Sequence, residues 1–184
     1  MVVPRSWKDA DGVAAMRDFL LQRPPRRAAV RELMAELLSP NPFARRCAAD
    51  LARRVSLREP GILRKYAGVL INLVSVIPLD QWQTRGYVTL AAALNASTHA
   101  QRMRLAVLVR ALVGNKRVAL RAIALEAFAN LAAREPELRD EVMLLVERSR
   151  CDGTFALRIR ARRMLLLLLP ASAEKCTRHR KTSL

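Results

Sequence analysis

The sequence contains few of the residues that form β-sheets and tight turns. Only 4% of its 184 residues are aromatic, and it has 6 glycines and 9 prolines. Ile, Val, Thr, Tyr and Phe are too sparse, and two-residue turns containing glycine too few, for a sheet protein of this length. These scarcities argue against a β-rich fold.

Groups that support catalysis or bind metals are also scarce. The two histidines, His99 and His179, are far apart in the sequence, and the three cysteines form no CxxC pair. A metal site built on histidine, a Ser-His pair and a disulfide framework are therefore disfavoured. We expect no enzyme activity and no cofactor, and we expect Cys47 and Cys151 to be small core residues.

Long apolar runs are missing as well. The longest one, 164–170, is about a third of the length that a membrane-spanning helix needs. The first ten residues contain no apolar stretch of the kind found in secretory leaders, and nearby acids disfavour a transit peptide. We expect a soluble, cytoplasmic protein without a membrane partner.

Helix-forming residues dominate what is present. The chain is 52% hydrophobic, and 29 Ala, 29 Leu and 28 Arg together make up 86 of the 184 positions. All three have high helix propensity, so the composition predicts an all-α fold. The length suits one domain or one short repeat array, and we expect a single domain over residues 1–170.

Positive charge is in large excess. The sequence has 33 Lys and Arg against 16 Asp and Glu, a formal charge of +17. Residues 171–184, which we expect to be a basic flexible tail, contribute +3, so 17 − 3 leaves +14 in the body. Such a surface attracts anionic partners. A solvated cationic surface without a ligand, reflecting a compositional bias, is the alternative.

An internal repeat is visible in the sequence. The triplet Arg-Glu-Pro at 58–60 returns at 134–136, a shift of 76 residues, and half of 76 is 38, a length that suits a two-helix repeat. The same shift places Arg45 on Arg121, and a further shift of 37 reaches Arg158. A small residue follows each of these arginines three positions later: Ala48, Ala124 and Ala161. Arg85 marks a weaker fourth copy.

The remaining segments also have helical periodicity, and prolines, glycines and polar residues separate them. These segments cover 28–38, 62–77, 100–113 and 138–148. We predict nine helices, a leading one at about 11–22 and then four antiparallel pairs joined by short connections. The repeats are expected at about 26–57, 60–96, 98–134 and 136–170. Single pairs of this size cannot bury their apolar faces alone, so they must stack.

A short motif precedes each second helix. Ser39, Asn115 and Asp152 each stand six residues before the shared arginine, and Asp80 stands five before Arg85. This pattern resembles the second helix of HEAT repeats, most closely at 118–131 and 152–164. The resemblance covers about residues 26–170 and extends to small bacterial HEAT-repeat proteins of unsettled function. It implies an α-solenoid of about four HEAT-like helical hairpins with an N-terminal capping helix.

The motif has a structural explanation. A polar turn residue can cap the following helix by accepting hydrogen bonds from its free N–H groups. The resemblance implies that the four shared arginines are scaffold residues that bind a turn carbonyl or an acid: Arg45, Arg85, Arg121 and Arg158. We expect close helix approach at the small residues of the motif, and also at Gly68 and Gly86. Neither the His-Glu pairs of HEAT-like hydroxylases nor the aromatic cluster of HEAT-like glycosylases is present.

Two basic clusters lie on predicted second helices. Arg46, Arg53 and Arg54 lie on one helix with Asp50, which is placed to pair with part of that charge. The last helix carries Arg160, Arg162 and Arg163, and no acid occurs between residues 153 and 173. Because HEAT arrays commonly present second helices on their concave face, both clusters could contribute to one basic, anion-binding trough.

Two aromatic residues stand out in the irregular second repeat. Trp82 and Tyr87 are candidate interface anchors, and packing over a helix junction is the alternative. The run Leu165–Leu169 is apolar on nearly all sides and predicts a buried last helix that needs a cover. The cover could be a second copy of the chain, another protein or a longer natural chain.

Two functions remain open on this sequence. The first is a non-catalytic scaffold that binds an acidic or helical protein partner through a basic concave surface. The second is a nucleic-acid-binding module that contacts the phosphate backbone through arginine clusters. Scarce aromatics disfavour stacking on single strands, so the second function would concern duplexes or structured backbones.

Overall fold

The computed structural model describes residues 27–168, and this part of the chain consists of α-helices and short turns without a strand. Its eight α-helices are α2 (Arg27–Leu37), α3 (Pro42–Arg58), α4 (Ala67–Val76), α5 (Trp82–Asn95), α6 (His99–Val113), α7 (Val118–Ala132), α8 (Arg139–Asp152) and α9 (Phe155–Leu168). Three 3-10 turns lie between them, η1 (Arg64–Tyr66), η2 (Leu79–Gln81) and η3 (Pro136–Leu138). The predicted all-helical class is confirmed. The predicted leading helix and the basic tail lie outside the described residues.

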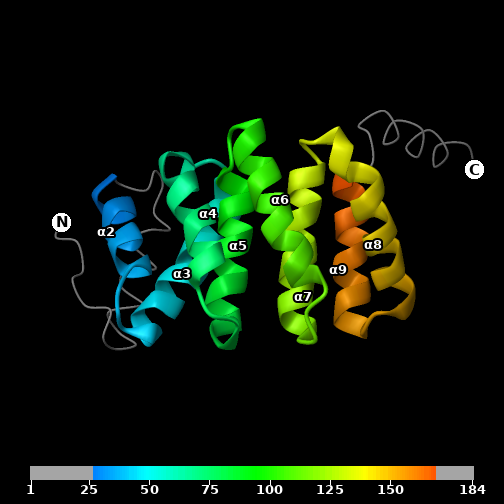
Figure 1. Ribbon diagram of the computed structural model, residues 1–184, viewed down its shortest axis with the longest axis horizontal. Coiled ribbons are helices and arrows are strands. Elements are labelled where there is room, and N and C mark those ends of the chain that lie inside the picture. The colour runs from blue at the N-terminus through cyan, green and yellow to red at the C-terminus, as the bar shows by residue number, and fades with distance from the viewer. Residues whose placement is uncertain (1–26, 169–184) are drawn as a thin grey trace, which may run out of the picture.

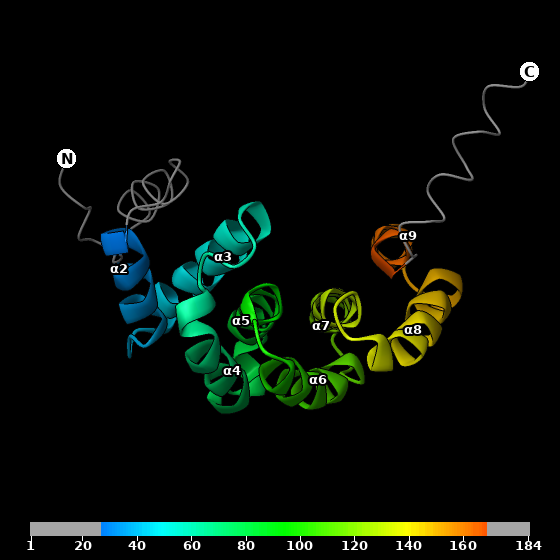
Figure 2. The ribbon, with the colours of Figure 1, turned by 90° about the horizontal axis from the view of Figure 1, so that it is seen from above.

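Helices that follow one another in the chain pack as pairs, α2 with α3, α4 with α5, α6 with α7 and α8 with α9. The second helices of these pairs also pack on each other, α3 on α5, α5 on α7 and α7 on α9 (Figure 1). Figure 2 shows the result as an arc with two rows of helices. We call α3, α5, α7 and α9 the inner row, which lines the concave side, and α2, α4, α6 and α8 the outer row.

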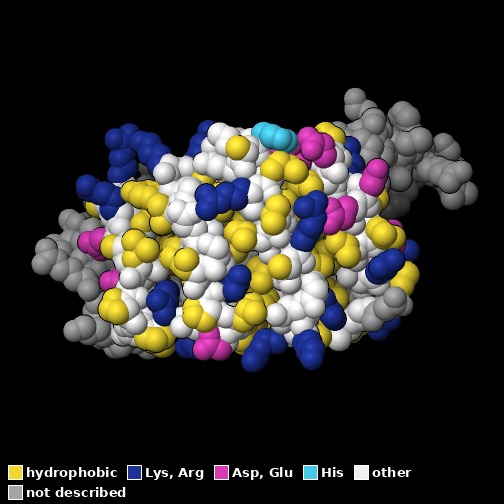
Figure 3. All heavy atoms as spheres, viewed as in Figure 1, with side chains coloured by type: hydrophobic (Ala, Val, Ile, Leu, Met, Phe, Trp, Pro, Cys, Tyr) yellow, Lys and Arg dark blue, Asp and Glu magenta, His cyan; other side chains and the backbone are white. Residues whose placement is uncertain are grey.

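The outer row is less continuous than the inner row. Helix α4 packs on α6, whereas α6 and α8 are joined at the surface mainly by an ion pair. In that pair Arg110 of α6 contacts both carboxylate oxygens of Glu141, with the shortest N–O distances at 2.7 Å. Figure 3 shows the outer-row face, where basic side chains are interspersed with apolar ones and acidic ones are few.

The core lies between the two rows and continues along the inner row. Helices α5 and α7 are buried on most sides, and Phe128 of α7 is the largest fully buried side chain. The small residues of the repeat motif, Ala48, Ala124 and Ala161, are all 0% exposed. Their burial agrees with the predicted close approach of helices, because a larger side chain at these positions would collide with its neighbours.

The two helical glycines differ in their surroundings. A Cβ atom at Gly86 would lie 3.2 Å from Leu120 Cδ1 and 3.3 Å from Ile123 Cδ1, so α5 and α7 approach closely there. A Cβ atom at Gly68 would meet nothing within 4 Å. The expected close approach holds for Gly86 and is wrong for Gly68, which is exposed near the start of α4.

Some helix starts differ from the sequence-based expectation. Helix α3 is capped by Asn41, whose Oδ1 accepts from Phe43 N at 2.9 Å, whereas Ser39 Oγ accepts only from Asn41 N. The Asn115 side chain binds the N–H of Arg117 in the turn before α7 rather than a helical N–H. A proline at the first helical position and a nearer asparagine explain why Ser39 is not the cap.

The predicted helix over 62–77 begins late, because α4 starts only at Ala67. Gly61 has a φ of 90°, which favours glycine, and η1 follows it. This turn places Arg64 at the edge of the molecule where α3 connects to α4. No helix in the described range has the length and apolar character to cross a membrane.

The apolar run at the end of α9 is only partly buried. Leu168 is 1% exposed, but Leu166 is 67% exposed and Leu167 is 50% exposed. The apolar run is therefore partly exposed in the part of α9 that the structure describes. The expected cover over it stays a prediction.

Candidate functional site

The basic cluster on α3 is partly neutralised within its own helix. Asp50 accepts from Arg53 Nη2 at 2.6 Å and from Arg54 Nε at 2.7 Å, so one carboxylate serves two guanidinium groups. Arg46 is exposed and lies over the ring of Phe43, 5.6 Å from its centroid. The predicted pairing with Asp50 is present, but it involves Arg53 and Arg54 rather than Arg46.

Aromatic side chains lie beside this cluster. The Arg53 guanidinium carbon lies 4.9 Å from the ring centroid of Tyr87, which links α3 to α5. Trp82, at the start of α5, is half-buried and packs against the core. It also lines a pocket of about 290 Å³ between the starts of α3 and α5. The other lining residues are Pro42, Phe43, Arg46, Asp80, Gln81, Gln83 and Thr84. Trp82 and Tyr87 pack on the core, as the packing alternative expects, and each keeps an exposed part. Their role as interface anchors stays a prediction.

The second basic cluster lies at the other end of the inner row. Arg160, Arg162 and Arg163 of α9 are all exposed. No hydrogen bond or ion pair joins them to another residue within the described range. Figure 2 places α3 and α9 toward opposite ends of the arc, with α5 and α7 between them, so the two clusters lie on helices that are not neighbours. Their contribution to one basic trough stays a prediction.

The four shared arginines fall into two kinds. Arg45 Nη1 donates to Ser39 O at 3.4 Å, and Arg85 Nη1 donates to Ile77 O at 3.0 Å, so both bind the preceding turn. Arg121 is only partly exposed and Arg158 is exposed, and neither side chain bonds to a residue that the structure describes. The expected scaffold contact is therefore present for Arg45 and Arg85, and for Arg121 it is absent among the described residues. For Arg158 it stays a prediction, because the structure does not describe the side chain of Asp152, the turn residue of the same repeat. Arg121 and Arg158 both add charge to the inner row.

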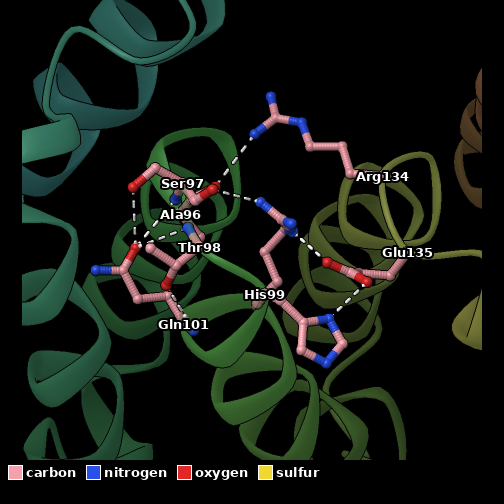
Figure 4. A network of polar contacts seen from close by, with 8 residues as sticks. Ala96, Ser97, Thr98, His99, Gln101, Arg134 and Glu135 are labelled. Carbon is pink, nitrogen blue, oxygen red and sulfur yellow. Dashed lines mark hydrogen bonds and ion pairs between the residues drawn. The ribbon is translucent and has the colours of Figure 1, made fainter.

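A polar network lies where one helix pair is connected to the next, at the edge opposite the turns that join the two helices of a pair (Figure 4). Glu135, after α7, is 4% exposed and accepts from Arg102 Nε at 2.5 Å. Its other oxygen lies 2.9 Å from His99 Nδ1. The hydrogen bond from Arg102 and then that from His99 lower the pKa of Glu135 below its ordinary value. A buried carboxylate with these partners is held in its charged form.

Three side chains in this network have the composition of a metal site. Donor atoms of His99, Glu135 and Glu137 lie within 4.8 Å of one another. However, both oxygens of Glu135 are already bound, one by Arg102 and the other by His99. A cation there would compete with a guanidinium, so the geometry is that of an ion-pair network.

Three arginines that are far apart in the sequence line one pocket beside this network. Arg64 follows α3, Arg102 lies on α6 and Arg134 follows α7, and all three line a pocket of about 230 Å³. Pro60, Gly61, Leu94, Asn95, Ala96 and Ser97 complete its lining. We call this cavity the arginine pocket. Arg102 Nη1 donates to Ser97 O at 2.7 Å, and Arg134 Nη1 donates to Ala96 O at 3.4 Å.

Sequence reasoning missed the arginine pocket. Its one available signal was the repeated Arg-Glu-Pro triplet at 58–60 and 134–136, which we interpreted only as a marker of the repeat. In the structure the second copy supplies both Arg134 of the pocket and the buried Glu135. Arg64 and Arg102 belong to no motif, and only the stacking of hairpins brings them to Arg134.

The cysteines do not share one environment. Cys47 is partly buried against the core, as expected, and burial raises the pKa of its thiol above the ordinary value. Cys151 at the end of α8 is exposed, so its predicted core position is wrong. Cys176 and His179 lie outside the described residues.

Comparison of the chain with protein-family models, with curated proteins and with solved structures finds no match.

Proposed function

We propose that the chain is a non-catalytic HEAT-like α-solenoid that binds an acidic or helical protein partner through its inner row. The observation that carries this proposal is the surface between α3 and α5, where Arg46, Arg53, Trp82 and Tyr87 lie around or beside a pocket. Trp, Tyr and Arg are the residues that dominate the energy of protein interfaces. The arc of paired helices supports the comparison with HEAT arrays.

The charges around this surface suit an acidic partner. Arg46 has no carboxylate partner in the described part of the chain, and Arg54 keeps 49% of its side chain exposed while bound to Asp50. Such rim charges act mainly on the rate of association, whereas aromatic anchors supply most of the affinity. A helical segment with acidic residues beside an apolar stripe would meet both features.

The proposal is tested by capturing partners with the full chain after nuclease treatment. A partner bound through the inner row should be lost, with at least about a tenfold fall in affinity, on combined Trp82→Ala and Tyr87→Ala substitution. Val107 and Leu144, exposed on the outer row at 63% and 55%, provide the matched control when both are changed to Ala. Equal loss in both variants, or no loss in the first, contradicts the proposal.

Nucleic-acid binding through phosphate contacts is the second candidate. Arg160, Arg162 and Arg163 of α9 favour it, because their exposed side chains form no ion pair in the part of the chain that the structure describes. Changing all three to Gln should weaken duplex binding and flatten the slope of log affinity against log salt by about two to three units. The matched control changes Arg31, Arg104 and Arg148 of the outer row to Gln. An unchanged slope in the α9 variant would rule out this function.

A further inference from the structure

We propose that the arginine pocket is a binding site for a divalent tetrahedral oxyanion, a phosphate group, held by Arg64, Arg102 and Arg134. The site lies on the edge formed by the hairpin connections, apart from the inner-row surface, and it does not rest on the function proposed above. A free phosphate ion and a phosphorylated side chain of a partner share this chemistry.

Charge balance in the pocket leaves room for an anion. Its three guanidinium groups carry three positive charges, and Glu135, bound to Arg102, supplies one negative charge, which leaves +2. Within the described residues, neither Arg64 nor Arg134 forms an ion pair with a carboxylate. A dianion would therefore match the charge that the protein itself leaves uncompensated.

The positive charges of the pocket act on the pKa of Arg134. Burial lowers the pKa of Arg134 from its ordinary value, and the positive charges of Arg102 and Arg64 lower it further. An effect of this kind requires the three charges to be close together in a partly desolvated place. An anion among them would remove the repulsion and form charge-assisted hydrogen bonds, which are the strong kind.

Two of the three arginines, Arg102 and Arg134, are also held in place for binding. Ser97 O and Glu135 fix Arg102 through its Nη1 and Nε, which leaves Nη2 without a partner among the described residues. Ala96 O likewise holds only Nη1 of Arg134, as Figure 4 shows. Gly61 allows Arg64 to lie close, because a Cβ atom there would be 3.2 Å from Arg64 Nη2. Donors oriented by the backbone lose little freedom when they bind an oxyanion.

Asn95 forms a fixed wall of the pocket. It is 1% exposed, accepts from Leu63 N at 2.6 Å and donates to Ser56 Oγ at 2.7 Å. These bonds tie the connection before α4 to the end of α5, so two of the three connections that supply the pocket are held together. The pocket is thus built on rigid elements.

The test is calorimetric titration of the full chain with inorganic phosphate, with sulfate, and with a short peptide in phosphoserine and serine forms. We expect one saturable site for phosphate, and at least about a tenfold loss of affinity on combined Arg64→Gln and Arg134→Gln substitution. Arg104→Gln with Arg148→Gln removes the same charge from the outer row, away from the pocket, and should leave affinity unchanged. Tighter binding of the phosphoserine peptide than of phosphate would identify a phosphorylated side chain as the ligand, and the reverse would identify the free ion.

A second measurement uses only the unchanged protein. Phosphate should protect Arg64, Arg102 and Arg134 from modification by phenylglyoxal, as read by peptide mass spectrometry, while Arg148 on α8 stays reactive. The proposal is overturned by the absence of saturable binding, by equal loss of affinity in both double variants, or by uniform protection of all arginines. Each of these results would mean that phosphate meets only a diffuse cationic surface.

Discussion

Arg45 Nη2 donates to Gln81 Oε1 across 2.9 Å, and this bond joins α3 to the turn that leads into α5. The same guanidinium binds Ser39 O in the turn before its own helix. Arg45 therefore connects two successive hairpins, whereas the side chain of Arg121, its equivalent two repeats later, bonds to no described residue. The arginine of the motif thus joins two hairpins in one repeat and adds only charge to the inner row in another.

Replacement of Arg45 by Ala should lower the free energy of unfolding by about 1–3 kcal/mol, because two hydrogen bonds from a charged donor are lost. The matched change Arg121→Ala should alter it by less than about 0.5 kcal/mol. Urea unfolding followed by circular dichroism measures both. Equal effects of the two substitutions would show that the bonds of Arg45 contribute nothing to stability.

The lowered pKa of Glu135 predicts that the stability of the folded protein depends on pH. Its pKa in the folded protein lies below the ordinary value of 4.5. The stabilisation from its charged form is therefore complete above that value and is lost as the pH falls through the lowered pKa. The difference in unfolding free energy between the wild type and Glu135→Gln should be largest near neutral pH and shrink below about pH 4.5.

Urea titrations over a range of pH test this dependence, with the exposed neighbour Glu137→Gln as the control. The control should show no comparable change in its difference from the wild type. A constant difference for Glu135→Gln across the acidic range would mean that the carboxylate has the same pKa in the folded and unfolded chains.

Gly68 and Gly86 should respond oppositely to alanine. Gly68→Ala should stabilise by up to about 0.5–1 kcal/mol, because alanine is the better helix former and the site is open. Gly86→Ala should be neutral or destabilising, since its methyl group would press on Leu120 and Ile123 between α5 and α7. Thermal unfolding compares them, and a more stable Gly86→Ala would mean that these side chains repack freely.

The cysteines should differ in reactivity. Burial raises the pKa of Cys47, so its thiolate is scarce and its sulfur is partly covered, whereas Cys151 is exposed. Iodoacetamide at mildly alkaline pH should alkylate Cys151 faster than Cys47 by about tenfold or more. Peptide mass spectrometry resolves each site, and the two rates should converge in denaturant. Equal rates in the native protein would contradict the packing of Cys47.

Most of the fold could be predicted because residues close together in the sequence determine where each helix lies. Helix propensity, apolar periodicity and prolines located the helices, and short connections required sequential packing. The errors arose where one residue competes with another for the same role. Asn41 displaced Ser39 as a cap because it stands directly before the helix, and the positive φ of Gly61 delayed the start of α4. Such local alternatives differ by about 1 kcal/mol, which composition does not resolve.

The candidate sites were predictable to different degrees. The pairing of Asp50 with Arg54 follows from helical spacing and was expected, whereas Arg53 takes the place that was expected of Arg46. The exposed arginines of α9, which have no ion pair within the described residues, were also expected. The arginine pocket was not, because Arg64 and Arg134 are 70 residues apart (134 − 64 = 70) and meet only through the stacking of three connections. No spacing rule within one helix contains that information.

The inner row and the outer row differ in what holds neighbouring helices together. Along the inner row each helix presses on the next through apolar side chains, which resist compression and separation. On the outside, α6 and α8 are bridged by the exposed pair of Arg110 and Glu141, whose strength falls with added salt. Apolar packing therefore holds the concave side of the arc together, while an exposed ion pair bridges its convex side between α6 and α8. The strength of that one connection depends on the ionic strength of the solution, whereas the packing of the inner row does not.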